Sequence, residues 1–349
     1  MITRKWNVHN VDNLTGHQDI VEAAMWIKDG EVVAFPTETV YGLGANACSN
    51  EAIEKIFEAK GRPSDNPLIV HISSREQLPL AASDWNEIAE KLMDAFWPGP
   101  LTIVLPKSKY IAEKTTAGLD TVGVRMPDHP VALALIELAG TPLAAPSANR
   151  SGKPSPTNAE HVFYDLNGRI KGIIDGGATG VGLESTVVEA SGGKVTILRP
   201  GGITKSQLET VVENVELDRA LLEENLVPKS PGMKYTHYAP NAPLYLINGD
   251  RTFFQDKINQ YQNDGQTVGI LVSDELAGQL TADEVRMVGP SDQIEKVAQQ
   301  LYNQLRSFDD SSVGVILAEM YPVEGIGEAL MNRLLKAAGN KVLSKNRQE

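Results

Sequence analysis

The sequence has a single cysteine and no long apolar run. Cys48 alone, in 349 residues, excludes a disulfide framework and a zinc site built from several cysteines. No apolar stretch approaches the ~20 residues that a membrane-spanning helix needs. The first ten residues, MITRKWNVHN, lack the apolar stretch of a signal peptide. We therefore expect a cytoplasmic chain with no membrane segment.

Acidic side chains outnumber basic ones, with 45 Asp and Glu against 32 Lys and Arg. The formal net charge is −13; residues 1–228 contain 20 Lys and Arg against 30 Asp and Glu, and residues 229–349 contain 12 against 15. A protein that binds nucleic acid across a broad face has an excess of basic residues there. The composition argues against such a face, so an anionic ligand would have to bind in a focused local site.

Several familiar motifs are missing. There is no G-x-x-x-x-G-K-[ST] phosphate loop, and the glycine-rich segment 176–182 (GGATGVG) does not fit G-x-G-x-x-G. No H-E-x-x-H occurs, and the six His are scattered, so neither a metal cluster nor a Ser/His/Asp triad has sequence support. A bound nucleotide would have to meet side-chain cations and loop amides.

Short apolar runs alternate with amphipathic segments in the first two thirds of the chain, which is typical of a mixed α/β domain with a large sheet. Helices are expected over 50–60 and 129–140, the second ending at Gly140. The order of the strands cannot be read from the sequence. Strands are expected at 31–37, 67–72, 101–106, 141–149, 172–177, 185–190 and 195–202.

The pattern changes near residue 216. Residues 216–243 have scattered Pro and Gly and little periodicity, which predicts a linker that is longer than a typical connection. A second, smaller α/β domain is expected after it. We therefore predict three parts: 1–215, the linker 216–243, and 244–349. The second domain has expected strands at 243–248, 267–273 and 313–320, and helices at 293–309 and 327–340.

The turn after the first helix collects polar side chains. Lys60, Gly61 and Pro63 suit a helix end, where a cation opposes the helix dipole and glycine adopts the left-handed cap. That explanation leaves Arg62 and Asn66 without a role. Because basic residues beside a turn often bind anions, an anion site is the alternative that we favour.

Other loops follow predicted strands, where ligands are often held. In 35–47 (FPTETVYGLGANA), the alternatives are a ligand loop and a polar turn in which Gly42 and Gly44 supply unusual dihedral angles. In 144–157 (AAPSANRSGKPSPT), Ser147 and Asn149 offer short hydrogen-bonding groups, or simply cap turns.

Charged residues also lie in or beside predicted strands. Arg125 stands in an otherwise apolar strand and needs a partner, which is either an internal acid or a substrate carboxylate. Ser185 begins one strand and Arg199 ends another, and neither is informative by itself.

Taken in order, eight segments resemble the threonylcarbamoyl-AMP synthase family with its YrdC-like fold. The last of them matches the linker of the longer, two-domain branch. The resemblance implies a twisted open α/β sheet domain and a smaller Rossmann-like α/β C-terminal domain joined by a long linker. The segments are FPTETVYGLGANA (35–47), KGRPSDNPLIVHI (60–72), FWPGPLTIVL (96–105), VGVRMPDHP (122–130), AAPSANRSGKPSPT (144–157), ESTVVE (184–189), LRPGGI (198–203) and SPGMKYTHYAP (230–240).

The resemblance implies an activity. Family members make threonylcarbamoyl-AMP from L-threonine, bicarbonate or CO2, and ATP, with release of pyrophosphate. Mg2+ would arrive with ATP, and no protein metal site is expected. Other proteins, a threonylcarbamoyl-transferase complex, would pass the group to tRNAs that read ANN codons. Direct binding of tRNA would be weak at most.

The resemblance also implies roles for individual residues. A basic and polar tetrad would lie in the central cleft and act in catalysis: Lys60, Arg62, Ser147 and Asn149. The nucleotide would meet Arg62, Asn66, Thr121, Ser147, Arg199, His237 and Tyr238, the last two from the linker. The threonine would be held by Thr39, His71, Arg125 and Ser185.

Two other readings stay open at this point. The fold is also linked to double-stranded RNA, so a non-catalytic RNA-binding module is one alternative, and the acidic composition speaks against it. The other is a carbamoyl-transfer domain of the hydrogenase-maturation kind. That class carries zinc fingers with several cysteines, whereas this chain has one.

Overall fold

The computed structural model describes residues 1–221 and 238–345. The chain forms two compact units, which are treated separately below. The first consists of Met1–Ser151 and Ser155–Lys234, and the second of Gly152–Pro154 and Tyr235–Glu349. No helix within the described ranges is long and apolar enough to cross a membrane.

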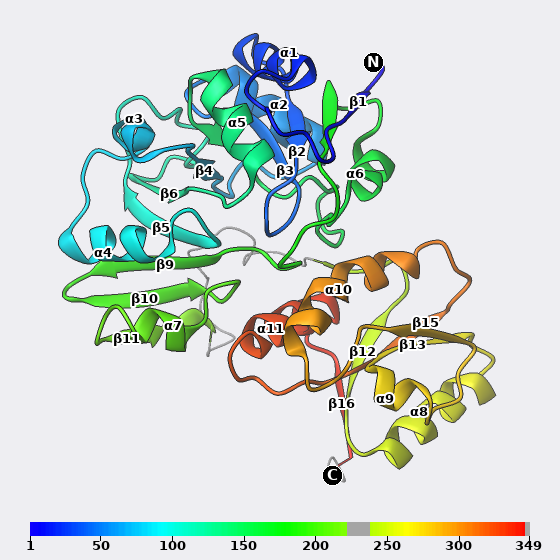
Figure 1. Cartoon of the computed structure of the whole chain (residues 1–349). Helices are drawn as coiled ribbons and strands as arrows, with labels where there is room; N and C mark the ends of the chain where they lie inside the picture. The colour runs from blue at the N-terminus through cyan, green and yellow to red at the C-terminus, as the bar shows by residue number, and fades with distance from the viewer. Residues whose placement is uncertain (222–237, 346–349) are drawn as a thin grey trace. The chain divides into compact units, whose positions relative to one another are not determined.

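The first unit is built on one large mixed sheet (Figure 1). Its described strands lie in the order β1-β8-β2-β3-β7-β4-β6-β5-β9-β10-β11, so neighbours in space are mostly distant in sequence. The strands are β1 (Arg4–Asn7), β2 (Val33–Phe35), β3 (Gly42–Asn46), β4 (Ile69–His71), β5 (Leu101–Pro106), β6 (Thr121–Arg125), β7 (Leu143–Ala144), β8 (Gly172–Asp175), β9 (Thr186–Ser191), β10 (Lys194–Arg199) and β11 (Val215–Leu217).

Capping residues mark the ends of helices in the first unit, as α2 shows. The Ser49 hydroxyl accepts a hydrogen bond from the amide of Ala52 at the start of α2, and Gly61 ends that helix at φ 61°. The helices are α1 (Gln18–Lys28), α2 (Asn50–Lys60), α3 (Leu78–Ala81), α4 (Glu87–Phe96), α5 (Pro130–Ala139), α6 (Ala159–Leu166) and α7 (Lys205–Glu209), with short 3-10 turns at Arg75–Gln77 and Arg219–Leu221.

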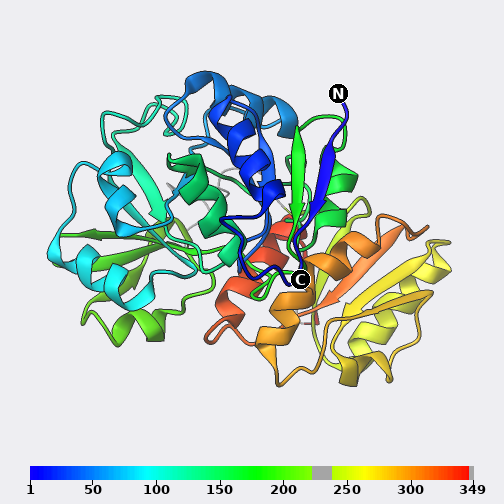
Figure 2. The same cartoon turned by 45° about the horizontal axis from the view of Figure 1, so that its top comes forward.

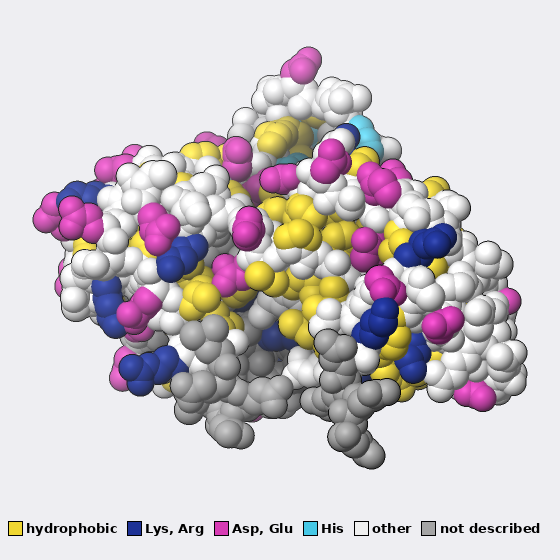
Figure 3. Space-filling model, turned by 90° about the horizontal axis from the view of Figure 1, so that it is seen from below, with side chains coloured by type: hydrophobic (Ala, Val, Ile, Leu, Met, Phe, Trp, Pro, Cys, Tyr) yellow, Lys and Arg dark blue, Asp and Glu magenta, His cyan; other side chains and the backbone are white. Residues whose placement is uncertain are grey.

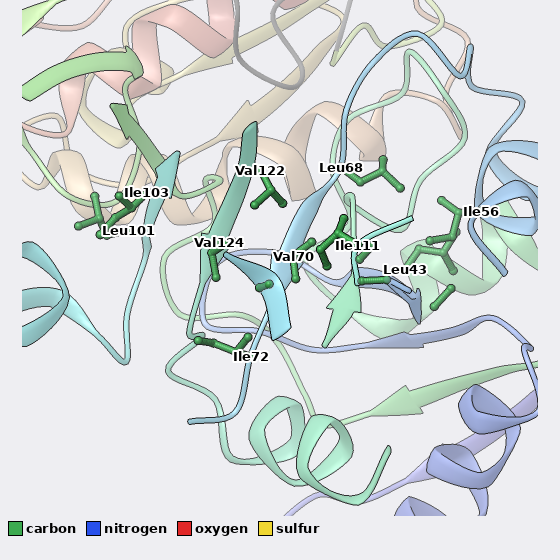
Figure 4. Packing of buried hydrophobic residues seen from close by; sticks show 14 of the residues in the cluster. Leu43, Ile56, Leu68, Val70, Ile72, Leu101, Ile103, Ile111, Val122 and Val124 are labelled. Carbon is green, nitrogen blue, oxygen red and sulfur yellow. The ribbon is translucent and has the colours of Figure 1, made fainter. Parts of the chain in front are cut away.

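Side chains alternate between the two faces of this sheet, as strand geometry requires. On one face, Ala34 and Val70 belong to the main apolar core, which also takes up residues of α2, α4 and α6. Figure 4 shows part of this core, with Val122 and Val124 of β6 beside Val70 and Ile72. On the other face, Val33 and Phe35 pack with residues of α1 and α5, which lie side by side in Figure 2. These two helices cover the part of that face around β1, β8, β2, β3 and β7.

The second unit has a five-stranded parallel sheet in the order β14-β13-β15-β12-β16 among its described residues. Helices α8 and α9 lie on one face and α10 and α11 on the other (Figure 1). The elements are β12 (Leu244–Asn248), α8 (Arg251–Asn263), β13 (Val268–Val272), α9 (Asp274–Ala277), β14 (Glu284–Met287), α10 (Ile294–Ser307), β15 (Val315–Glu319), α11 (Gly327–Ala337) and β16 (Val342–Ser344).

The second unit also includes the tripeptide Gly152–Pro154. The amide of Ala239 donates to the carbonyl of Gly152 at 3.0 Å. Lys153 forms an ion pair with Asp309 at 2.9 Å, and Arg306 donates through Nε to the carbonyl of Pro154 at 3.1 Å.

The α/β prediction, with a large sheet and a second smaller Rossmann-like one, is confirmed. The predicted bounds 1–215, 216–243 and 244–349 stay a prediction. Residues 222–237 of the predicted linker lie outside the described residues.

Candidate active site

One region of the large sheet carries polar side chains where an apolar layer would be expected. Alternation puts the polar residues of β4, β5 and β6 on the face opposite the main core. A bulge in β10 between Ile197 and Arg199 makes Arg199 the partner of Val187 and so puts it on the same face. A small apolar cluster of Ile69, Val187 and Leu198 lies on the same face. We call this region the polar face; it is formed by His71, Thr102, Thr121, Arg125, Ser185 and Arg199.

Arg125, the last residue of β6, is nearly fully buried, and three groups fix its guanidinium. Its Nε donates to the carbonyl of Gly99 at 3.2 Å, and one Nη donates to the hydroxyl of Thr39 at 3.0 Å. The other Nη lies 2.6 Å from a carboxylate oxygen of Glu38. The internal acid that the sequence left open therefore exists. The role of Arg125 as a substrate carboxylate clamp stays a prediction.

His71 lies directly beside Arg125, because the two residues are register partners in the parallel pair β4 and β6. Burial, together with the charge of Arg125, lowers the pKa of His71 to about 3. Its Nδ1 donates to the carbonyl of Ile69 at 3.2 Å. His71 is therefore neutral near pH 7, and its Nε2 is left as an acceptor.

Ser185 and Arg199 form a second contact on the polar face. The Ser185 hydroxyl is 2.8 Å from the hydroxyl of Thr102. Arg199 donates to the carbonyl and the hydroxyl of Ser185, at 2.8 and 3.1 Å. The structure thus joins Ser185, a predicted threonine-binding residue, to Arg199, a predicted nucleotide-binding one.

Lys60 ends α2 and is buried against the loop after β7. Its Nζ donates to the carbonyls of Ser147 and Asn149, at 2.5 and 2.6 Å. The hydroxyl of Ser147 donates to the side-chain oxygen of Asn149 at 2.5 Å. The structure therefore brings together three of the four members of the predicted catalytic tetrad, which we call the Lys60 group.

Arg62, the fourth member, reaches forward along its own turn. Its guanidinium donates to the carbonyls of Asn66 and Pro67, both at 3.3 Å. The Asn66 side chain is buried, and its Nδ2 donates no hydrogen bond to a described residue. A buried amide without an acceptor is costly, so Asn66 is suited to donate to a ligand.

Thr121 begins β6 and Arg125 ends it, on the same face. Four residues at ~3.3 Å each place them about 13 Å apart along the strand. Predicted nucleotide and threonine contacts therefore start from opposite ends of one short strand.

The segment 37–42 links the Lys60 group to Arg125. Thr39 contacts Arg125, while Gly42 pairs with Ser147 through the backbone. The alternative that Gly42 and Gly44 supply unusual dihedral angles is wrong, since neither has a positive φ. They are strand residues of β3, and a Cβ on Gly44 would lie 2.7 Å from the Phe35 ring.

Tyr238 lies in the second unit, where its ring stacks on Tyr302 at 5.3 Å and the guanidinium of Arg333 lies over it. It is buried. His237 lies outside the described residues. The assignment of both residues to the nucleotide stays a prediction.

The sequence assigned no specific role to three residues beside the site. Thr102 interrupts the apolar run of 101–106, a signal that could have found it. Glu184 is buried and accepts a hydrogen bond from Ser155 at 2.5 Å. Glu38 lies in the candidate ligand loop 35–47, but nothing in its sequence context indicates that it contacts Arg125.

The described residues contain no group of three or more His, Cys, Asp or Glu that could hold a metal ion. Magnesium binds proteins through few carboxylates and keeps its remaining ligands from water and phosphate. The Mg2+ expected to arrive with ATP stays a prediction.

The fold and the site define a class: an α/β protein that buries the Lys, His and Arg side chains of Lys60, His71, Arg125 and Arg199. Comparison with known proteins gives the family. A family model described as "Telomere recombination", of Sua5, YciO and YrdC proteins, matches residues 25–201. Another, described as "Threonylcarbamoyl-AMP synthase, C-terminal domain", matches residues 203–339.

Full-length relatives agree. The chain is 54% identical to a threonylcarbamoyl-AMP synthase of Bacillus subtilis over 98% of this chain and 100% of the relative. It is 49% identical to one of Pyrococcus abyssi, over 92% and 94%. The crystal structure of P. abyssi Sua5 complexed with L-threonine has a TM-score of 0.92 at 47% identity, covering 98% of this chain and 99% of that one. The chain belongs to the threonylcarbamoyl-AMP synthase family of enzymes, in its two-domain form.

Proposed function

We propose that this chain joins L-threonine, bicarbonate or CO2, and ATP into threonylcarbamoyl-AMP and releases pyrophosphate. The observation that carries the proposal is the polar face, where Arg125, His71 and Arg199 are buried together on a sheet of the family's fold. The relative of known structure that is complexed with L-threonine supports the choice of amino acid.

The reaction explains why the site needs cations. The threonine ammonium loses a proton, and its nitrogen then forms a bond to the carbon of CO2 with loss of a second proton, or to the carbon of bicarbonate with cleavage of a C–O bond and loss of water. Either route gives an N-carboxylate. That carboxylate then attacks the α-phosphorus of ATP, the bond to the β-phosphate oxygen breaks, and pyrophosphate leaves. Two anions have to approach each other, so fixed positive charges lower the barrier, and such groups contribute a few kcal/mol each.

Residues of this chain have separate tasks in the proposal. Lys60, Arg62 and Arg199 offset charge on the phosphates and the N-carboxylate, with Ser147, Asn149, Asn66 and Thr121 beside the nucleotide. Arg125 holds the threonine carboxylate with Thr39, His71 and Ser185 around the amino acid. For Tyr238 and His237, contact with the nucleotide remains an expectation from the family resemblance. Mg2+ bound to ATP offsets charge on the leaving pyrophosphate.

No side chain acts as the nucleophile, because the nucleophile comes from the substrate. Holding two substrates in line replaces a catalytic triad. The product is a labile mixed anhydride, which is then consumed by a threonylcarbamoyl-transferase complex that modifies tRNA reading ANN codons. We place the reaction in the cytoplasm, in line with the lack of any disulfide framework.

The RNA-binding alternative gains no support from the surface in view. On the face shown in Figure 3, Lys and Arg side chains are interspersed with Asp and Glu. A gel shift with tRNA that weakened steeply with salt, without turnover, would favour that alternative.

The test is an assay with ATP, L-threonine and 13C-labelled bicarbonate, followed by mass spectrometry of the nucleotide products. We expect pyrophosphate and an adenylate that carries both threonine and the label. Omission of threonine or bicarbonate should stop pyrophosphate release. Release of pyrophosphate without threonine would contradict the proposal.

A further inference from the structure

We propose that Glu38 recognises the ammonium group of the substrate, so that Glu38 and Arg125 together select an α-amino acid as a zwitterion. The inference rests on the proposed function and adds a specificity-determining residue to it.

The geometry of the pair is the first support. A carboxylate oxygen of Glu38 lies 2.6 Å from an Nη of Arg125, with the two side chains 13% and 5% exposed. The other contacts of Arg125 run to the Gly99 carbonyl and the Thr39 hydroxyl, both neutral. Glu38 is therefore the negative charge in contact with the guanidinium.

The second support is what the Glu38 carboxylate lacks. Despite the short separation, neither of its oxygens accepts a hydrogen bond with good geometry from any described residue. Buried carboxylates normally accept several. The backbone of Glu38, by contrast, is fixed, because its carbonyl accepts the amides of Gly180 and Val181 at 3.1 and 2.8 Å. The residue is held in place while its carboxylate keeps the capacity to accept donors.

An α-amino acid supplies what this pair needs. Its ammonium carries three donors and no acceptor, and it is attached to the same carbon as the carboxylate. With the substrate carboxylate on Arg125, the proposal directs the neighbouring ammonium toward Glu38, because Glu38 contacts the same guanidinium. A ligand without the ammonium would bring a second carboxylate to a guanidinium that already has one, and the two negative charges would repel.

The experiment compares two ligands on the intact chain. L-Threonine and 2,3-dihydroxybutanoate share the carbon skeleton, and the second has a hydroxyl in place of the ammonium. We expect calorimetry on the natural protein to give at least about 10-fold tighter binding of threonine, since hydrogen bonds to charged groups have effects of about that size. In Glu38→Gln, threonine should lose about 10- to 100-fold in affinity. The hydroxy acid, which no longer meets the repelling carboxylate, should bind as well as before or better, so the ratio of the two falls toward one.

A purely structural role gives a different result. If Glu38 only orients Arg125, Glu38→Gln weakens both ligands equally and leaves their ratio unchanged, which would overturn the inference. Glu38→Asp keeps the charge and should retain most of the ratio. Glu284→Gln removes the acid of another ion pair, with Arg286 at 2.7 Å in the second unit, and should alter neither ligand.

The natural protein alone also decides the matter if Glu38→Gln does not fold. Equal binding of the two ligands by a protein that still makes the adenylate would overturn the role of Glu38 and leave the proposed function standing. A natural protein that neither binds threonine nor makes the adenylate would overturn both.

Discussion

Two parts of the site each hold a buried cation, and they do so in different ways. One is the Lys60 group; the other, which we call the Arg125 group, consists of Arg125, Glu38, Thr39 and His71. The hydrogen bonds of Lys60 to Ser147 and Asn149 run to carbonyl oxygens. Arg125 lies against an acid. In the proposed function the two groups meet different ligands: Lys60 faces a polyanionic phosphate chain, whereas the charge pair of Arg125 and Glu38 faces a zwitterion.

The largest effect is expected at the Lys60 group. Lys60→Ala should lower turnover by about 10²- to 10³-fold, the usual loss for one preorganised donor at a developing charge. Stability should also fall, because the carbonyls of Ser147 and Asn149 lose their donor. Pyrophosphate release and thermal unfolding measure the two effects. Lys60→Arg keeps the positive charge and serves as the control. Full turnover in Lys60→Ala would remove this group from the mechanism.

A change in the Arg125 group should instead weaken the binding of threonine. Arg125→Ala is expected to raise the threonine KM by about 10- to 100-fold, because a charged hydrogen-bonding group is lost. The ATP KM should change much less. Steady-state kinetics with each substrate varied in turn checks the split. If only thermal stability changed, the carboxylate clamp would be wrong.

Strand β3, which follows the segment 37–42, offers a test of the packing beneath the two groups. Gly44→Ala places a Cβ 2.7 Å from the Phe35 ring, and overpacking of this kind costs about 1–3 kcal/mol. The free energy of unfolding measures this cost. Gly278→Ala, where nothing lies within 4 Å of the added Cβ, is the control. An unchanged stability for Gly44→Ala would mean that β3 and Phe35 shift freely.

The smallest effect is a pH dependence from His71. Its folded-state pKa of about 3 lies below the ordinary 6.5, so the unfolded chain binds a proton that the folded chain refuses. His71 therefore contributes full stability above pH 6.5, and this is lost as the pH falls from 6.5 toward 3. Between pH 7.5 and 5.5 the contribution drops by about 1 kcal/mol. Chemical unfolding at pH 7.5 and 5.5 measures the free energy of unfolding of the natural protein and of His71→Gln. The difference between the two pH values should be smaller by this amount in His71→Gln. An equal difference in both proteins would mean that His71 is protonated in the folded state.

The sequence was most informative where periodicity is local. The helix predicted over 50–60 and the strand predicted over 101–106 coincide with α2 and β5, because spacing of apolar residues and a capping glycine act within a few positions. Membership of the family also followed from ordered motifs, and the comparisons confirmed it.

What the sequence could not supply depends on contacts between distant segments. The neighbours His71 and Arg125 are set by the register of β4 and β6, which no local pattern encodes. Glu38 meets Arg125 from a different loop, so the partner that Arg125 required could not be named. Gly42 and Gly44 resembled turn glycines, yet they are strand residues beside the Phe35 ring.

A crystal structure with L-threonine and a non-hydrolysable ATP analogue tests the central claim most directly. The account predicts the threonine carboxylate on Arg125, with the phosphates in hydrogen-bond reach of Lys60, Arg62 and Arg199. Phosphates bound away from those three side chains would contradict it.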